Sequence, residues 1–251
     1  MREILISSLS LICFAGAGLG ALYLFPRSAE HQQSGETAAT IRHIAGFFVV
    51  VSSLVFGLMI SSAKTTFEAI DANMHGFATE LILFDKALKS YGTEMVAARK
   101  SLSRYVQEAI DHPTRADDAL SYREDVPGKH LDEIGDTLSG VAPADSYQQL
   151  LLTEIRQQYH RIVERRWSLV EQSEGNIPMP LIGMLIAWLT LIFMSMGYRA
   201  PPNTAVVTCL ITAATLAAAS IYLVLDMDIP FAGTIQISVS PLRRALAAFS
   251  L

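Results

Sequence analysis

Charged residues are scarce in this chain and unevenly placed. Lysine, arginine, aspartate and glutamate make up 17% of its 251 residues, against about 25% in an average soluble domain. Of the 43 charged residues, 32 lie between Lys64 and Pro178, which leaves 11 for the other 136 residues. This division excludes a single soluble globule and a disordered chain. It indicates a membrane protein that carries a polar insert.

Common signatures of catalysis and of nucleic-acid binding are also missing. The two cysteines, Cys13 and Cys209, lie in apolar runs without a CxxC spacing, so we interpret them as packing residues. The six histidines have neither HExxH nor HxxxH spacing, and no Walker, Rossmann or GxSxG motif occurs. The insert holds 13 basic and 19 acidic residues without a basic stripe, which argues against nucleic acid as a partner. We therefore predict no enzymatic activity and no cofactor.

Four uncharged apolar runs are present, at residues 4–24, 44–63, 181–198 and 205–225. Each has about the 17–25 residues that a helix needs to cross a bilayer, and helix is the expected state of a backbone in lipid. The first run is longer than the apolar part of a signal peptide, so we predict an uncleaved span. Gly16 and Gly20 within it form a small-xxx-small pair, which permits close approach of another helix.

The predicted fold is all-α, with four transmembrane helices and a helical domain inserted between the second and the third. The expected division is 1–63, with the first two spans, then 64–178, the inserted domain, and then 179–251, with the last two spans and a C-terminal tail. Near the membrane, the side with both termini and the insert has more basic residues (Arg2, Lys64, Arg165, Arg166, Arg243, Arg244) than the other side (Arg27, Arg42, Arg199). The positive-inside rule then predicts a multi-pass inner-membrane protein with both termini and 64–178 in the cytoplasm.

The insert has the periodicity of helices. Beyond the second run, apolar residues recur at alternating steps of 3 and 4 residues (Phe67, Ile70, Met74, Phe77, Leu81, Phe84, Leu88, Tyr91), which is a heptad seam. No proline separates this seam from the second run, so one helix from about 44 to 90 is expected, ending at Gly92. Gly76 within it marks either a kink or close packing. The seam must be buried in the chain's own bundle or against another subunit.

Further helices are expected after this long one. Thr93 can cap the first of them, which stops at His112 and Pro113. A short helix follows at about 131–138. Ser146 and Gln149 form a capping-box pattern at the start of a helix that runs to about Glu174. In the C-terminal tail, Ile235, Ile237 and Val239 alternate on one face, which favours docking against the long helix over the membrane surface.

Several short motifs resemble the bestrophin-like membrane proteins of bacteria, a domain of unknown function. They lie at 61–67, 83–88, 91–92, 98–99, 200–203, 226–233, 237–238 and 241–242. The resemblance implies kinship with bestrophin channels, which are oligomeric four-span proteins with cytoplasmic helices. It also implies structural roles for eight residues that match the family's motifs (Asp85, Tyr91, Gly92, Arg99, Asn203, Pro230, Phe231, Gly233). Asp85, Tyr91 and Arg99 are expected to form a buried polar network rather than an active site.

Two groups of residues are candidates for contact with ions. Asp226 and Asp228 end the fourth span, where two carboxylates could contact a cation or form an acidic ring in an oligomer. The alternative is a structural salt bridge or cap, because a carboxylate at a helix C-terminus needs a compensating partner. Ser52, Ser53 and Phe56 in the second span could line a pore or simply pack within the bundle. Whether Asp226 and Asp228 bind a metal is left open.

The first functional hypothesis is an oligomeric bestrophin-like ion channel or transport protein. Its second span would line the path, with Asp226 and Asp228 at the cytoplasmic mouth. The expected partners are the lipid bilayer, further copies of the chain, and inorganic ions. The alternative is a non-conducting membrane scaffold or sensor whose cytoplasmic helices bind a protein partner.

Overall fold

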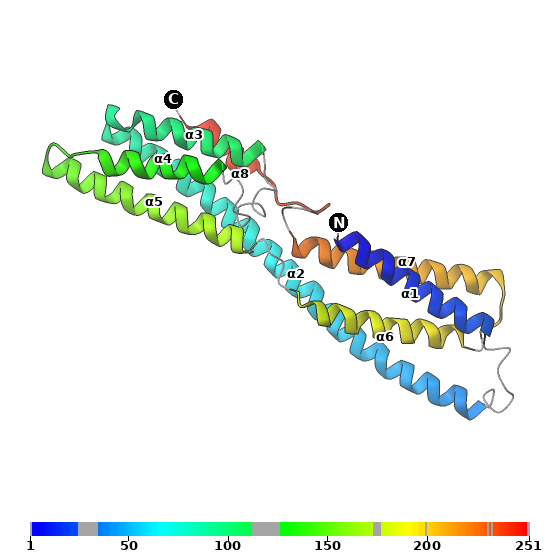
Figure 1. Cartoon of the computed structure of the whole chain (residues 1–251). Helices are drawn as coiled ribbons and strands as arrows, with labels where there is room; N and C mark the ends of the chain where they lie inside the picture. Colours follow the sequence, from blue (N-terminus) through cyan, green and yellow to red (C-terminus); the bar gives the residue numbers. More distant parts are fainter. Residues whose placement is uncertain are drawn as a thin grey trace. The chain divides into compact units, whose positions relative to one another are not determined.

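The computed structural model describes residues 2–24, 35–111, 126–172, 177–198, 200–229, 231 and 233–249. Over these ranges the chain forms helices and no strand, so the all-α prediction is confirmed. Figure 1 shows α1 (Arg2–Leu24), α2 (Gly35–Tyr91), α3 (Val96–Asp111), α4 (Val126–Gly140), α5 (Ser146–Gln172), α6 (Met179–Gly197), α7 (Thr204–Asp228) and α8 (Ser240–Ala248). A short 3-10 helix, η3 (Thr93–Met95), precedes α3.

The chain divides into two compact units. The first unit consists of Met1–Thr65 and Asn176–Asp228, and the second of Thr66–Gly175 and Ile229–Leu251. Helix α2 contributes residues to both units as one uninterrupted helix of 57 residues. This agrees with the helix expected from about 44 to 90, although α2 begins earlier. The C-terminal segment, including α8, belongs to the second unit.

Four helices are long and apolar enough to cross a membrane, as predicted. They are α1, α6 and α7 over their whole lengths, and the segment Ala39–Tyr91 that contains the apolar part of α2. Three of the four predicted runs fall within one of them, and the third, 181–198, extends one residue beyond the end of α6.

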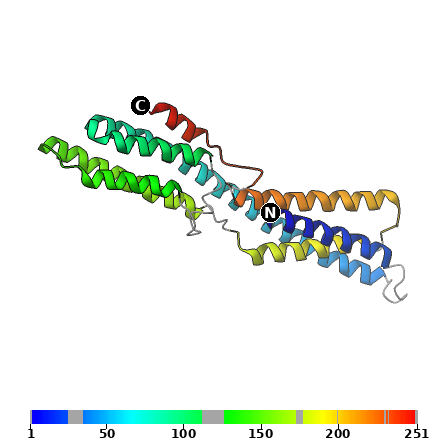
Figure 2. The ribbon, with the colours of Figure 1, turned by 45° about the horizontal axis from the view of Figure 1, so that its top comes forward.

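The first unit is held together by α1, which packs on both α6 and α7 (Figure 2). The rings of Phe14 in α1 and Phe193 in α6 stack with centroids 5.3 Å apart. The Ser7 hydroxyl donates to the carbonyl oxygen of Ala218 in α7 at 3.0 Å. Apolar packing therefore holds this interface together, and the hydrogen bond from Ser7 adds to it.

Helices α1 and α6 approach each other closely at Gly18 and Gly197. A Cβ on Gly197 would overlap the carbonyl oxygen of Gly18, and a Cβ on Gly18 would lie 3.4 Å from the carbonyl oxygen of Phe193. By contrast, a Cβ on Gly16 or Gly20 would meet nothing within 4 Å. The close contact of α1 with α6 therefore uses Gly18, and the predicted pair Gly16 and Gly20 has no part in it.

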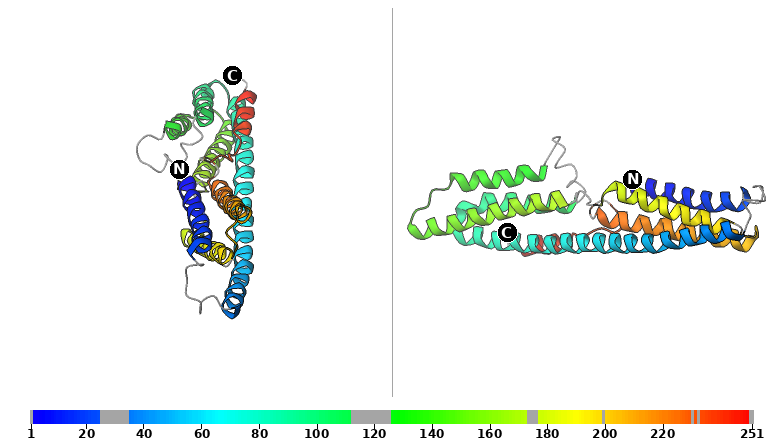
Figure 3. Two further views of the ribbon diagram at one scale, coloured as in Figure 1. Left: turned by 90° about the vertical axis from the view of Figure 1, so that its right-hand side faces the viewer. Right: turned by 90° about the horizontal axis from the view of Figure 1, so that it is seen from below.

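The second unit buries the heptad seam of α2. Seven of its eight residues, from Ile70 to Tyr91, are at most 7% exposed and belong to one apolar core, and Phe67 packs against that core. Helix α3 packs on α4, α4 contacts α5, and α8 packs on α3 (Figure 3). The seam is thus covered by the chain's own helices, which was one of the two alternatives.

Local details of the second unit differ from expectation at the start of α5. The backbone N–H of Gln148 donates to Oδ1 of Asp145 at 2.7 Å, and Oε1 of Gln148 accepts from the N–H of Ala144 at 2.9 Å. Asp145 therefore caps α5 and Gln148 reaches back to the residue before the cap, whereas the predicted pair was Ser146 and Gln149, one residue later. Aspartate is as good a cap as serine, so the pattern alone did not fix the register.

The C-terminal segment docks on the second unit through alternate residues. Ile237 is 5% exposed and lies in the core, while Ile235 and Val239 are partly buried and the residues between them are exposed. This confirms the predicted alternation. Helix α8, which was not predicted, adds Leu242, Ala245 and the following Phe249 to the same core.

Replacing Gly197 with Ala should destabilise the first unit. The new methyl group meets a backbone carbonyl, which cannot move away as a flexible side chain could, so a cost of about 1–3 kcal/mol is expected from overpacking. Thermal unfolding of the full chain in detergent measures the effect as a lower Tm. Gly16→Ala is the matched control and should not lower Tm. Equal Tm values for the two variants would contradict the close contact.

Candidate functional site

Asp226 and Asp228 lie in the last turn of α7 and are buried. Asp226 is 1% exposed and Asp228 is 6% exposed. Oδ2 of Asp228 accepts a hydrogen bond of 3.1 Å from the backbone N–H of Ile177, two residues before α6 begins. Carboxylates are stabilised near the N-terminus of a helix, where backbone N–H groups lack partners. Asp228 therefore joins the end of α7 to the start of α6 within the first unit.

The two carboxylates do not belong to a metal-binding cluster in this structure. Among the residues that the structure describes, no three His, Cys, Asp or Glu side chains are placed to hold a metal ion. The hydrogen bond to Ile177 supplies the compensating partner that a carboxylate at the end of α7 requires. This geometry favours the structural role over direct ion contact for Asp228.

Ser52, Ser53 and Phe56 are divided between two faces of α2. Ser52 is 3% exposed, and its Oγ has no hydrogen-bond partner. Phe56, one turn later, packs against the apolar core of the first unit. Ser53 is exposed, and its hydroxyl donates to the carbonyl oxygen of Val49 at 2.7 Å. The three residues therefore do not share one face, and only Ser53 faces away from the core.

Small and polar residues continue along the same exposed side of α2 as Ser53. They follow one another at steps of 7, 4, 4 and 3 residues, which keeps them on one face of a helix. We call this set the outer stripe: Gly46, Ser53, Gly57, Ser61 and Lys64, all of them exposed. A Cβ on Gly46 or Gly57 would meet nothing within 4 Å. The apolar part of α2 is also the least buried of the four candidate spans. Of the residues in its apolar window, 11% are buried, against 17–22% in the other three.

In the second unit, Asp85 and Arg99 form a buried ion pair. Nε of Arg99 donates to Oδ1 of Asp85 at 2.8 Å, and Nη2 donates to Oδ2 at 3.2 Å, with side chains 11% and 3% exposed respectively. The hydroxyl of Tyr91 is buried without a hydrogen-bond partner, so it does not extend this pair into a network. The pair joins α2 to α3 across the turn at Gly92, whose φ of 131° favours glycine.

The remaining motif residues have structural positions. Oδ1 of Asn203 accepts from the N–H of Val206 at 2.8 Å and so caps α7. Phe231 packs against the core of the second unit, and Gly233 is partly buried in a bend. Pro230 lies outside the described residues. Capping by Asn203 could be found from the sequence, because asparagine directly precedes an apolar helical run.

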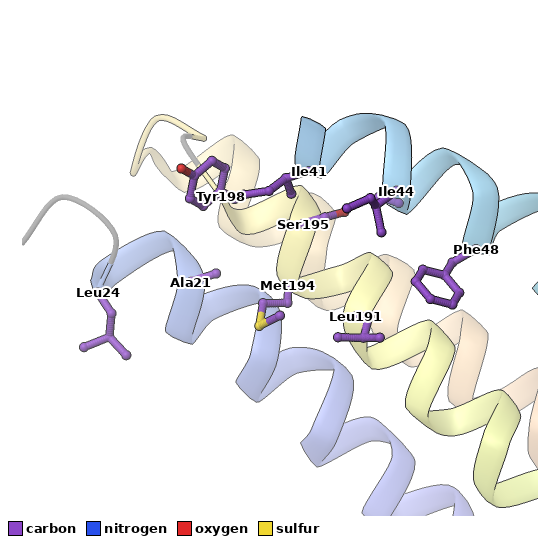
Figure 4. A pocket seen from close by; sticks show the side chains of 10 residues that line it. Ala21, Leu24, Ile41, Ile44, Phe48, Leu191, Met194, Ser195 and Tyr198 are labelled. Carbon is purple, nitrogen blue, oxygen red and sulfur yellow. The ribbon is translucent and has the colours of Figure 1, made fainter. Parts of the chain in front are cut away.

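The structure also contains an apolar pocket that the sequence analysis did not predict. Its volume is about 350 Å³, and it lies in the first unit between α1, α2 and α6 (Figure 4). It is lined by Ala21, Leu24, Ile41, Ile44, Ala45, Phe48, Leu191, Met194, Ser195 and Tyr198. No motif marks such a pocket, because its residues are those of any membrane span.

The fold defines a helical membrane protein with four apolar spans and a second helical unit that contains most of the charge. A family model, described as the bestrophin-like domain, matches residues 12–242, which is nearly the whole chain. The protein therefore belongs to the bestrophin-like family, as its motifs indicated. No curated protein and no solved structure matches the chain.

Replacing Asp228 with Ala should destabilise the protein, because it removes the acceptor for the Ile177 N–H. A hydrogen bond to a charged group contributes about 1.5–3 kcal/mol, so Asp228→Ala should lower the Tm of the full chain in detergent. Asp228→Asn retains an acceptor oxygen and should cost less. If Asp228→Ala leaves Tm unchanged, the hydrogen bond does not hold the ends of α6 and α7 together.

Proposed function

We propose that this protein is an oligomeric ion channel or transport protein of the bestrophin-like family, without enzymatic activity. The outer stripe of α2 lines the path between subunits, and inorganic ions are the cargo. The observation that carries the proposal is the exposed row of small and polar residues on the least buried span.

The chemistry of the outer stripe supports a path lined by α2. Two of the five residues of the outer stripe are serines, and a serine hydroxyl oxygen can replace part of an ion's hydration shell. Glycines at positions 46 and 57 leave space beside the helix or allow another helix to approach closely. Lys64 lies at the end of the stripe and adds a charge there.

The packing of the first unit supports an oligomer. Its interior is filled by side chains such as Phe14 and Leu185, which are fully buried, and by Ile221, which is 1% exposed. A water-filled path through one subunit would have to replace this core. The open side of α2 offers the alternative, in which several copies place their outer stripes around a shared axis.

Within this proposal, Asp226 and Asp228 keep the end of α7 in place rather than contact the ion. Their burial and the hydrogen bond to Ile177 support that role. Asp226→Asn and Asp228→Asn should then change stability but not ion selectivity. A change in selectivity at wild-type Tm would instead assign the carboxylates to the mouth of the path.

We further propose that the protein is a multi-pass protein of the inner membrane with both termini and residues 64–178 in the cytoplasm. The excess of basic residues on that side supports this orientation. A green fluorescent protein fused after Leu251 should fluoresce in cells, and a periplasmic phosphatase fused there should be inactive. An active phosphatase fusion would reverse the orientation.

One observation favours the second candidate function, a membrane scaffold or sensor that binds a protein partner. Tyr147 and Leu150 lie one turn apart at the start of α5 and are 69% and 71% exposed. Under this candidate, these two exposed apolar side chains are where a protein partner would bind. This candidate predicts no ion flux.

Flux measurements on the purified full chain in liposomes test the channel. The wild type should carry ion flux well above that of empty liposomes, and Gly57→Leu should abolish most of it by filling the space beside the outer stripe. Gly16→Leu is the matched control, because Gly16 is also a span glycine with nothing within 4 Å of its Cβ position.

Two outcomes would contradict the channel. Flux no higher than in empty liposomes, across several ions and calcium levels, would leave the scaffold as the better candidate. Equal loss of flux in Gly57→Leu and Gly16→Leu would remove the special role of the outer stripe. Counting subunits in single particles gives an independent check, since the proposal requires an oligomer.

A further inference from the structure

The apolar pocket between α1, α2 and α6 occupies a place where α2 has no core contacts. From Ala39 to Val51 no residue of α2 is buried, whereas Met59 and Ala63, later in the same span, are 4% and 1% exposed. Figure 4 shows Ile41, Ile44 and Phe48 of α2 facing Leu191 and Met194 of α6 across the pocket. Within the first unit, α2 is thus packed at one end of its span and open at the other.

The lining has the chemistry of a hydrocarbon site. Eight of its ten residues are purely apolar, and the two that carry hydroxyl groups are Ser195 and Tyr198. The Ser195 hydroxyl already donates to the carbonyl oxygen of Ile192 at 2.7 Å, so it does not require a polar ligand. Because eight of the ten lining residues are apolar, a polar ligand would lose most of its hydration here.

The position of the pocket along the spans indicates which kind of hydrocarbon it would bind. Its lining residues belong to α1, α2 and α6, which are all long and apolar enough to cross a membrane, and to Tyr198 directly after α6. Tyr198 follows the last residue of its span, which is where tyrosine marks the membrane–water interface. A lipid whose headgroup lies at that interface would have its acyl chain at the depth of Met194 and Leu191.

We propose that this pocket binds one acyl chain of a membrane phospholipid. The chain replaces the missing side-chain contacts between the first part of the α2 span and the α1–α6 pair, because an unfilled apolar space forfeits dispersion contacts on every wall. The side wall next to Phe48 continues to Trp188, whose ring centroid is 6.5 Å from that of Phe48. This inference does not depend on ion conduction.

Fluorescence of Trp188 provides the test in lipid vesicles. The chain has two tryptophans, and Trp167→Phe leaves Trp188 as the sole one while keeping an aromatic ring beside Arg166. In vesicles of phosphatidylcholine with brominated acyl chains, Trp188 should be quenched. Ala45→Phe fills the pocket and should reduce the quenching. If this large side chain prevents folding, Ala45→Leu replaces it and should give a smaller reduction.

Ala219→Phe is the matched control, because Ala219 is exposed on α7 and does not line the pocket. It should leave the quenching at the level of the Trp167→Phe parent. Native mass spectrometry of the full chain in mild detergent should also show one retained phospholipid per subunit, lost in Ala45→Phe and kept in Ala219→Phe.

Three results would overturn the proposal. Equal quenching in the Ala45 variants and the control would mean that Trp188 senses only the surrounding bilayer. Absence of a retained phospholipid in the wild type would mean that no chain is held. A change in subunit number in Ala45→Phe, without quenching in the parent, would assign the pocket to a side chain of a second copy.

Discussion

The structure depends on one continuous helix, α2, which has to contribute to two units of different composition. Helix α2 runs for 57 residues without a break, so its surface pattern must change along its length while its backbone does not. In its apolar part, large hydrophobic side chains such as Phe47, Val50 and Leu54 are exposed, as is typical of a helix that faces lipid or another apolar surface. Beyond Lys64 the apolar residues of α2 are confined to one heptad seam, and the residues of that seam pack in the core of the second unit. The same helix therefore contributes residues to two cores.

The sequence predicted those features that follow from periodicity and composition. Uncharged runs located the four spans, and alternating steps of 3 and 4 residues located the seam from Phe67 to Tyr91, because both patterns are repeated enough to exclude other folds. Single-residue choices were less predictable. The small-xxx-small spacing pointed to Gly16 and Gly20, whereas Gly18 meets Gly197, since the partner helix decides which face of α1 is used. The cap of α5 shifted by one residue, because Asp145 and Ser146 are both good caps.

The candidate site shows the same division. The sequence showed that Asp226 and Asp228 are unusual residues for the end of a span. Their burial, and the hydrogen bond between Asp228 and Ile177, depend on how α6 and α7 meet. Likewise, Ser52 and Ser53 are adjacent in the chain, yet a helix turns about 100° per residue, so one faces the core and the other the outside. Which serine is on which side could not be decided without the packing of α1, α6 and α7. The bidentate pair of Asp85 and Arg99 joins two helices that are adjacent in the chain, and the resemblance had already drawn attention to both residues.

The second unit is discontinuous in the chain. Its core takes most of its residues from 66–175, but Ile237, Leu242, Ala245 and Phe249 come from the segment after the last span. The polypeptide therefore leaves this unit, forms α6 and α7 of the first unit, and returns to complete the second. An excised fragment of 66–175 would expose the surface that these four side chains cover. It follows that the two units must mature together, since the core of the second is completed only after α7 has been synthesised.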